Sequence, residues 1–270
     1  MTATATPQNR RDELAAVFAQ ARICERCPQL AASRTQVVFG AGNADADILF
    51  IGEAPGRSED EQGVPFVGAA GKLLADLLGE IGIAREDVFI ANVLKCRPPD
   101  NRNPEPAEIE RCSPWLWRQI ELIEPIVVVT LGNFATKLLR GDPTGISRLH
   151  GTVEERVLGT RRVRLMPSYH PAAALYQRSN RELIAADFAQ IPQLLALGPP
   201  EQTLAAVVPA VGAGGDPGAD EPSAEELAEA RVSFEADRGD GSEPAGGRAV
   251  ERADDPAVEP AASPEQLGLF

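Results

Sequence analysis

The sequence predicts an α/β fold in three layers, with a central, mainly four-stranded parallel sheet between helices. Four short apolar segments have the length and composition of buried strands, and segments with helical periodicity lie between them. Strands that alternate with helices form parallel sheets covered on both faces. The strands are expected at 47–52, 88–93, 126–132 and 163–168, and the helices at 11–22, 69–81, 106–123, 133–139 and 181–195.

Composition divides the chain into one domain and flanking segments. We expect a flexible N-terminus at 1–9 and a folded domain at 10–197. From 198 to 265 proline, glycine, alanine and acidic residues dominate, so this segment has too little apolar surface to offset the entropy of ordering. We predict a disordered tail there, with a transient helix near 223–234, followed by a short apolar C-terminus at 266–270.

Most of the acidic charge lies in this tail. The chain has 40 acidic and 26 basic residues, and 16 of the acidic but only 4 of the basic ones follow position 200. Residues 1–200 therefore carry 24 acidic and 22 basic side chains and are close to neutral. The low overall isoelectric point thus gives no argument against nucleic-acid binding by the folded part.

The sequence contains no apolar run of membrane-spanning length and no apolar segment of signal-peptide type near its start. We therefore expect a cytoplasmic protein that is associated with the nucleoid when it acts, and that contacts no membrane. In a reducing compartment four cysteines are better explained as metal ligands than as disulfides.

Residues suited to a binding site follow each predicted strand. Gly52 and Glu53 come at the end of the first strand, Asn92 ends the second, Gly132 ends the third, and His170 follows the fourth. In open parallel sheets, ligands bind beyond the carboxyl ends of the strands. The sequence therefore predicts an active site at this edge.

The cysteines indicate a metal site near the same edge. Cys24 and Cys27 form a C-x-x-C pair, Cys96 follows the second strand, and Cys112 lies in the next helix. Thiolates bind soft metals. A four-cysteine zinc site usually has two close pairs, whereas one close pair with two separate cysteines favours an iron–sulfur cluster. Zinc remains the alternative.

The two histidines are interpreted differently. His170 precedes a proline, which favours an extended conformation at the strand end, and its place at the edge of the sheet favours a functional role. His150 lies in a polar loop and is expected to be solvated. The glycines after the first strand allow close approach to a ligand, but they form neither a Walker loop nor a dinucleotide-binding motif.

Together these segments resemble the family-4, thermostable-type uracil-DNA glycosylases that carry a [4Fe-4S] cluster. The resemblance covers about residues 10–197 and includes all four cysteines in register. Its motifs are GEAPGxxED at 52–60, GxPFVGxAG at 63–71, NVxKCRPPxNRxP at 92–104 and HPAA at 170–173.

The resemblance implies roles for individual residues. Phe66 would stack on an extruded uracil, and the Asn92 amide would bond the uracil edge. His170 would stabilise the uracil anion as it leaves, and Glu53 would orient water or stabilise the positive sugar. Gly52 and Ala54 would line the pocket, with Ala54 where other uracil glycosylases carry a catalytic aspartate. The four cysteines would hold the cluster as a structural element.

DNA contacts are expected from the loops at the same edge. Candidate phosphate ligands are Arg57, Arg102, Arg148 and Arg178. The loop after His170 departs from the usual family pattern, so either Leu175 or Tyr176 would be the side chain that enters the duplex.

The C-terminus resembles the short motif by which bacterial repair proteins bind the sliding clamp. The residues concerned are Gln266, Leu267, Leu269 and Phe270. A long acidic tether would raise the local concentration of such an anchor. The alternative is that the acidic tail shields the DNA-binding face.

The favoured function is therefore a monomeric, monofunctional glycosylase that removes uracil from DNA and initiates base-excision repair. Two alternatives remain open. One is a non-catalytic iron–sulfur module that binds nucleic acid, and the other is a glycosylase that acts mainly on another deaminated base.

Overall fold

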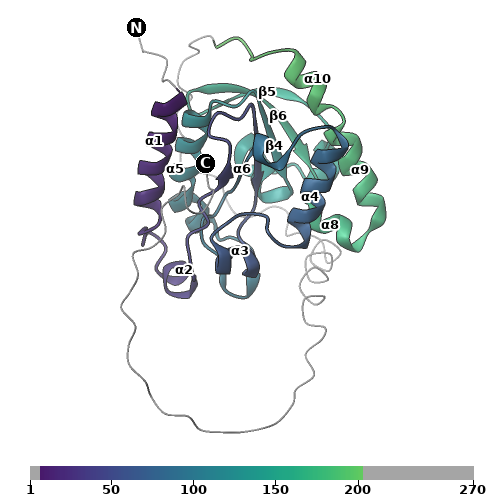
Figure 1. Cartoon of the computed structure of the whole chain (residues 1–270). Helices are drawn as coiled ribbons and strands as arrows, with labels where there is room; N and C mark the ends of the chain where they lie inside the picture. The colour runs from purple at the N-terminus through teal and green to yellow at the C-terminus, as the bar shows by residue number, and fades with distance from the viewer. Residues whose placement is uncertain (1–6, 203–270) are drawn as a thin grey trace, which may run out of the picture.

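The structure is a computed structural model that describes residues 7–202 (Figure 1). The 266–270 motif, the helix expected near 223–234, and all of the acidic tail beyond position 202 lie outside the described residues. No helix within the described range is long and apolar enough to cross a lipid bilayer.

A six-stranded sheet forms the centre of the domain, in the order β1-β3-β2-β4-β6-β5. The four central strands pair in parallel, which confirms the predicted parallel sheet. Antiparallel strands β1 and β5 lie at the two edges and were not predicted. The strand bounds are β1 Ala41–Gly42, β2 Ile48–Gly52, β3 Phe89–Asn92, β4 Val127–Leu131, β5 Glu154–Leu158 and β6 Arg161–Ser168.

Helices surround the sheet, and all five predicted helical segments are helical in the structure. The predicted 181–195 helix is nevertheless two helices, because Pro192 has no amide hydrogen to continue the first one. The bounds are α1 Pro7–Ala21, α2 Pro28–Ser33, α3 Arg57–Gln62, α4 Ala69–Glu80, α5 Pro106–Ile123, α6 Asn133–Arg140, α7 Ile146–Leu149, α8 Pro171–Tyr176, α9 Arg178–Phe188 and α10 Ile191–Ala196; single 3-10 turns span Arg85–Asp87 and Pro99–Asn101.

Two apolar cores separate the three layers. Alternate residues of β2 point to opposite faces, as the pleat requires. Leu49 and Ile51 pack into the core beneath α1, α5 and α6, whereas Ile48 and Phe50 pack into the core beneath α4, α9 and α10. Figure 1 shows α1 and α5 on one side of the sheet and α4, α8 and α9 on the other. The predicted α/β/α layering is confirmed.

The second core gives a test of this packing. Phe188 is fully buried, and its ring lies 5.4 Å from that of Phe50 on β2. The substitution Phe188→Ala should lower the free energy of unfolding by about 3–5 kcal/mol, because it removes apolar contacts and leaves a cavity. Leu183→Ala, on the exposed side of the same helix, should cost less than about 1 kcal/mol. Equal losses in denaturant unfolding would contradict this packing.

Candidate active site

The carboxyl ends of β2 and β3 build one wall of the site. Gly52 and Asn92 are register partners at the ends of these strands. Backbone pairing continues beyond them, because the Val93 N–H donates to the Gly52 carbonyl at 2.9 Å and the Leu94 N–H donates to the Glu53 carbonyl at 3.0 Å. The segments that carry Glu53 and Asn92 are therefore held side by side.

The Asn92 side chain and the Phe66 ring both lie close to Gly52. A Cβ atom added to Gly52 would lie 2.4 Å from Asn92 Oδ1 and 2.9 Å from the Phe66 ring, so glycine is required for this close packing. Asn92 is only 2% exposed, and its Oδ1 atom has no hydrogen-bond partner. A buried amide oxygen without a partner is costly unless a ligand supplies a donor.

The loop that carries Phe66 is held in an unusual conformation. Phe66 has a φ of +55°, in the left-handed region that few bulky residues adopt. The Glu59 carboxylate accepts hydrogen bonds from the backbone N–H groups of Val67 at 3.0 Å and Gly68 at 3.1 Å. A Cβ atom on Gly71 would lie 1.8 Å from the Phe66 carbonyl oxygen. The loop thus depends on Glu59 and on glycine at position 71.

His170 lies at the start of α8, beside the Phe66 ring. Its Nδ1 atom accepts a hydrogen bond from the Ala172 backbone N–H at 3.1 Å and so caps the helix. In the neutral ring the proton is therefore on Nε2, which is the free donor. The imidazole stacks on Phe66, with ring centroids 5.4 Å apart and planes inclined by 26°.

Burial changes the pKa values of both titratable groups of the site, Glu53 and His170. Burial raises the pKa of the Glu53 carboxyl to about 7 and lowers the pKa of His170 to about 4. Near neutral pH His170 is uncharged, while Glu53 is partly ionised. Ala54, the next residue, is half-buried and packs against the core beneath α1 and α5.

The four cysteines line one small cavity between α1, α2 and α5. All four are free thiols, and Cys96 and Cys112 are buried. The Arg34 guanidinium donates to Cys96 Sγ at 3.3 Å, and the Lys95 backbone N–H donates to Cys112 Sγ at 3.2 Å. Burial raises the pKa of the Cys112 thiol to about 12. Buried thiolates without a positive partner are unfavourable. A metal that replaces the thiol protons would supply the positive charge that compensates them.

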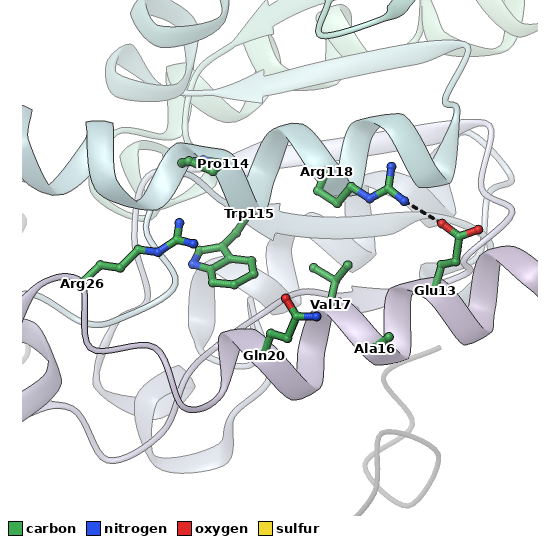
Figure 2. A pocket seen from close by; sticks show the side chains of 8 residues that line it. All are labelled: Glu13, Ala16, Val17, Gln20, Arg26, Pro114, Trp115 and Arg118. Atoms are coloured by element: carbon green, nitrogen blue, oxygen red, sulfur yellow. Dashed lines mark hydrogen bonds and ion pairs between the residues drawn. The ribbon is translucent and has the colours of Figure 1, made fainter.

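An arginine and a tryptophan form part of the wall of this cavity. The Arg26 guanidinium lies over the Trp115 ring, 4.5 Å from its centroid. Figure 2 shows this pair at one end of a separate groove of about 410 Å³ between α1 and α5. At the other end of the groove, Arg118 forms an ion pair with Glu13 at 2.6 Å. The groove includes none of the strand-end residues.

Comparison with known proteins identifies the family. A model described as the uracil DNA glycosylase superfamily matches residues 39–193. The type-4 uracil-DNA glycosylase of Archaeoglobus fulgidus is 49% identical over 175 residues, which is 63% of this chain and 87% of the relative. Those of Thermotoga maritima and Saccharolobus solfataricus are 45% and 44% identical, and the matches cover 63% and 70% of this chain and 88% and 89% of each relative.

The chain belongs to the type-4 uracil-DNA glycosylase family. The family match includes the strand ends, Phe66, Asn92, His170 and two of the four cysteines, since Cys24 and Cys27 precede residue 39. The longer pairwise matches to the type-4 enzymes extend beyond this core.

Side chains on α8 of this type-4 domain have the exposure that contact with DNA needs. Leu175 is 49% exposed and Tyr176 is 42% exposed, both on the short helix that His170 begins. Arg178 is exposed where the next helix, α9, begins.

The remaining candidate arginines differ in their contacts. Arg57 is exposed at the start of α3 and bonds Glu61 at 2.9 Å. Arg148 is exposed on α7. Arg102 is bound by both carboxylate oxygens of Glu108, at 2.6 and 2.9 Å, and so fixes the loop before α5. This contact gives Arg102 a structural role that sequence reasoning missed.

The expectation that His150 is solvated is wrong, because its ring has partners within the protein. Its Nδ1 atom lies 3.2 Å from the buried carboxylate of Asp187, and its ring contacts Tyr169 at 4.7 Å between centroids. The other oxygen of Asp187 accepts from the Ser168 hydroxyl at 2.8 Å. Asp187 is distant in the sequence from both His150 and Ser168, so no local pattern identifies it. Its hydrogen bonds hold His150 at the end of β6, next to the segment that carries His170.

Glu59 provides a test of the loop geometry. The substitution Glu59→Ala should release the Phe66 loop, because it removes the acceptor for the N–H groups of Val67 and Gly68. Hydrogen exchange measured on peptides that cover 64–70 should become faster. Glu61→Ala, which changes an exposed carboxylate on the same short helix, is the matched control. Unchanged exchange in Glu59→Ala would show that this carboxylate does not hold the loop.

Proposed function

We propose that this chain is a uracil-DNA glycosylase that rotates uracil out of DNA and hydrolyses its N-glycosidic bond, which is the first step of base-excision repair. Membership of the type-4 family supports this activity. The observation that carries the proposal is the unpartnered, buried Oδ1 atom of Asn92 beside Phe66. An acceptor in this setting suits a flat ligand with a ring N–H group.

Asn92 is proposed to read the uracil edge. Its Oδ1 atom would accept from uracil N3–H, and its amide nitrogen would donate to O4, while Phe66 stacks on the ring. Cytosine has an acceptor at N3 and a donor at C4, so both bonds would be lost and a buried amide would stay unpaired. Mismatches of this kind discriminate by about 10⁴-fold.

His170 is proposed to stabilise the leaving group. As the C1′–N1 bond breaks, negative charge develops on uracil O2. The Nε2–H donor that the Ala172 N–H contact selects can then bond this oxygen. Because the pKa of His170 is lowered to about 4, the donor is a neutral imidazole throughout the neutral pH range.

Glu53 is proposed to act on the sugar side of the bond. Its backbone is paired with the segment after Asn92, so Glu53 and the proposed uracil-reading residue are held side by side. When it is ionised, this carboxylate can stabilise the positive charge that develops on the sugar, or orient the attacking water. Gly52 allows the base to approach this wall, and Ala54 extends it.

Extrusion of the base is assigned to the exposed residues near His170. Unstacking and unpairing a nucleotide costs a few kcal/mol. Leu175 or Tyr176 would fill the space that the base leaves in the duplex. Arg57, Arg148 and Arg178 would bind phosphates, which makes binding dependent on salt. Arg102 would contribute to this surface through the loop that its Glu108 contact holds.

We propose that Cys24, Cys27, Cys96 and Cys112 hold a [4Fe-4S] cluster. The donor set fits, because four thiols surround one cavity with N–H donors directed at two of the sulfurs. One close pair, Cys24 and Cys27, with two separate cysteines favours a cluster over zinc, whose four-cysteine sites usually have two close pairs. When bound, the cluster would cross-link the C-x-x-C segment to α5.

We further propose that the C-terminus binds the bacterial sliding clamp through Gln266, Leu267, Leu269 and Phe270. Deleting these terminal residues, 266–270, should abolish capture by the clamp and leave excision on short oligonucleotides unchanged. Changing both Leu267 and Phe270 to alanine should abolish capture as well, without shortening the chain. Clamp capture that persists in both variants would show that the motif is accidental.

Excision from a single-uracil oligonucleotide tests the main proposal. Anaerobically purified protein should produce alkali-sensitive sites at uracil and none at thymine in the same position. His170→Ala should slow excision by about 10²–10³-fold, as expected when one leaving-group donor is lost. Absence of cleavage by wild-type protein with a full complement of iron would reject the activity. Equal rates for wild type and His170→Ala would remove His170 from the mechanism.

The pH dependence tests Glu53. A carboxyl group with a pKa raised to about 7 is protonated below that pH, so single-turnover excision should increase through about pH 7 and then level off. Below the pKa the rate should fall about tenfold for each pH unit. Glu53→Gln should be slow and independent of pH in this range. Iron content measured at each pH separates this effect from loss of the cluster. A flat wild-type profile would contradict the role of Glu53.

A further inference from the structure

A fully buried lysine connects the cysteine cavity with the proposed uracil-reading residue. Lys95 Nζ donates to the backbone carbonyl of Asn92 at 2.8 Å and to Gln119 Oε1 at 2.5 Å. The ammonium also faces the Phe39 ring, 5.8 Å from its centroid. Gln119 in turn donates through Nε2 to the Phe39 carbonyl at 2.9 Å. Each member of this network therefore has a defined partner.

The backbone of Lys95 is fixed as firmly as its side chain. Its N–H donates to Cys112 Sγ at 3.2 Å, and its carbonyl accepts from the Val38 N–H at 2.8 Å. Cys96, the next residue, contributes its thiol to the same cavity. One residue thus contacts a cysteine of the cavity through its backbone and the end of β3 through its ammonium group.

The Lys95 side chain is held by direct contacts alone. It is 2% exposed, and its ammonium contacts a carbonyl, an amide oxygen and a ring. No water can replace these partners at such depth, so a hydrogen bond lost here leaves a buried polar group unpaired. The Asn92 carbonyl therefore depends on Lys95 for its donor.

We infer that Lys95 is a positioning residue that links the cysteine cavity to uracil recognition, by holding the carbonyl of Asn92 and so fixing the amide that reads the base. This inference rests on the proposed uracil-DNA glycosylase function. It gives the cysteine site a consequence for substrate selection in addition to its structural role. The segment 92–96 carries both functions, and the Lys95 side chain connects its two ends.

Lys95→Met tests this inference in the full-length, iron-loaded protein. Methionine keeps the length and removes the donors. The inhibition constant of free uracil should increase at least about tenfold, because Asn92 loses the contact that fixes it. Binding to undamaged DNA and the iron content per chain should not change. Loss of iron from the variant would overturn the inference, since Lys95 would then serve to retain the cluster.

The single variant Gln119→Met separates positioning from stability. It removes the other side-chain partner of Lys95 and leaves the bond to the Asn92 carbonyl in place. Thermal stability should fall as it does in Lys95→Met, because buried hydrogen bonds are lost in both variants. The inhibition constant of free uracil should stay close to the wild-type value. An equal increase of this constant in both variants would refute a positioning role. If wild-type protein excised no uracil at all, the proposed function itself would fail, which is a different result.

Discussion

The structure depends on the parallel pairing of β2 and β3 and on its continuation past the strand ends. Gly52 and Asn92 are in register, and the next backbone hydrogen bonds join Glu53 to the segment after Asn92. This pairing fixes two of the proposed site residues relative to each other before any side chain is considered. It also leads the chain from Asn92 directly to Cys96, so the pocket and the cysteine cavity share one short segment.

Burial has opposite chemical effects on the two titratable groups of the site. The same exclusion of water raises the pKa of Glu53 to about 7 and lowers the pKa of His170 to about 4. A neutral imidazole suits stabilisation of a developing anion, because its donor hydrogen is fixed by the Ala172 contact. Phe66 stacks against His170, so the ring proposed to stack on the base and the proposed leaving-group donor belong to one packed unit.

The central sheet and part of the proposed site could be predicted from the sequence. Apolar runs predict the four parallel strands because these are buried on both faces, and strand-end positions predict that Glu53, Asn92 and His170 gather at one edge. The edge strand β5 escapes such analysis because it is mostly charged or polar and half-exposed. The roles of Asp187 and Lys95 escape it because their partners are set by packing, not by local spacing.

Inhibition by free bases shows whether the buried Asn92 amide selects uracil. Excision from a single-uracil oligonucleotide would be measured with free uracil or free cytosine added, for wild type and for Asn92→Ala. Uracil should inhibit the wild-type protein far more strongly than cytosine does, and Asn92→Ala should lose this preference. Equal inhibition of the wild-type protein by both bases would contradict it.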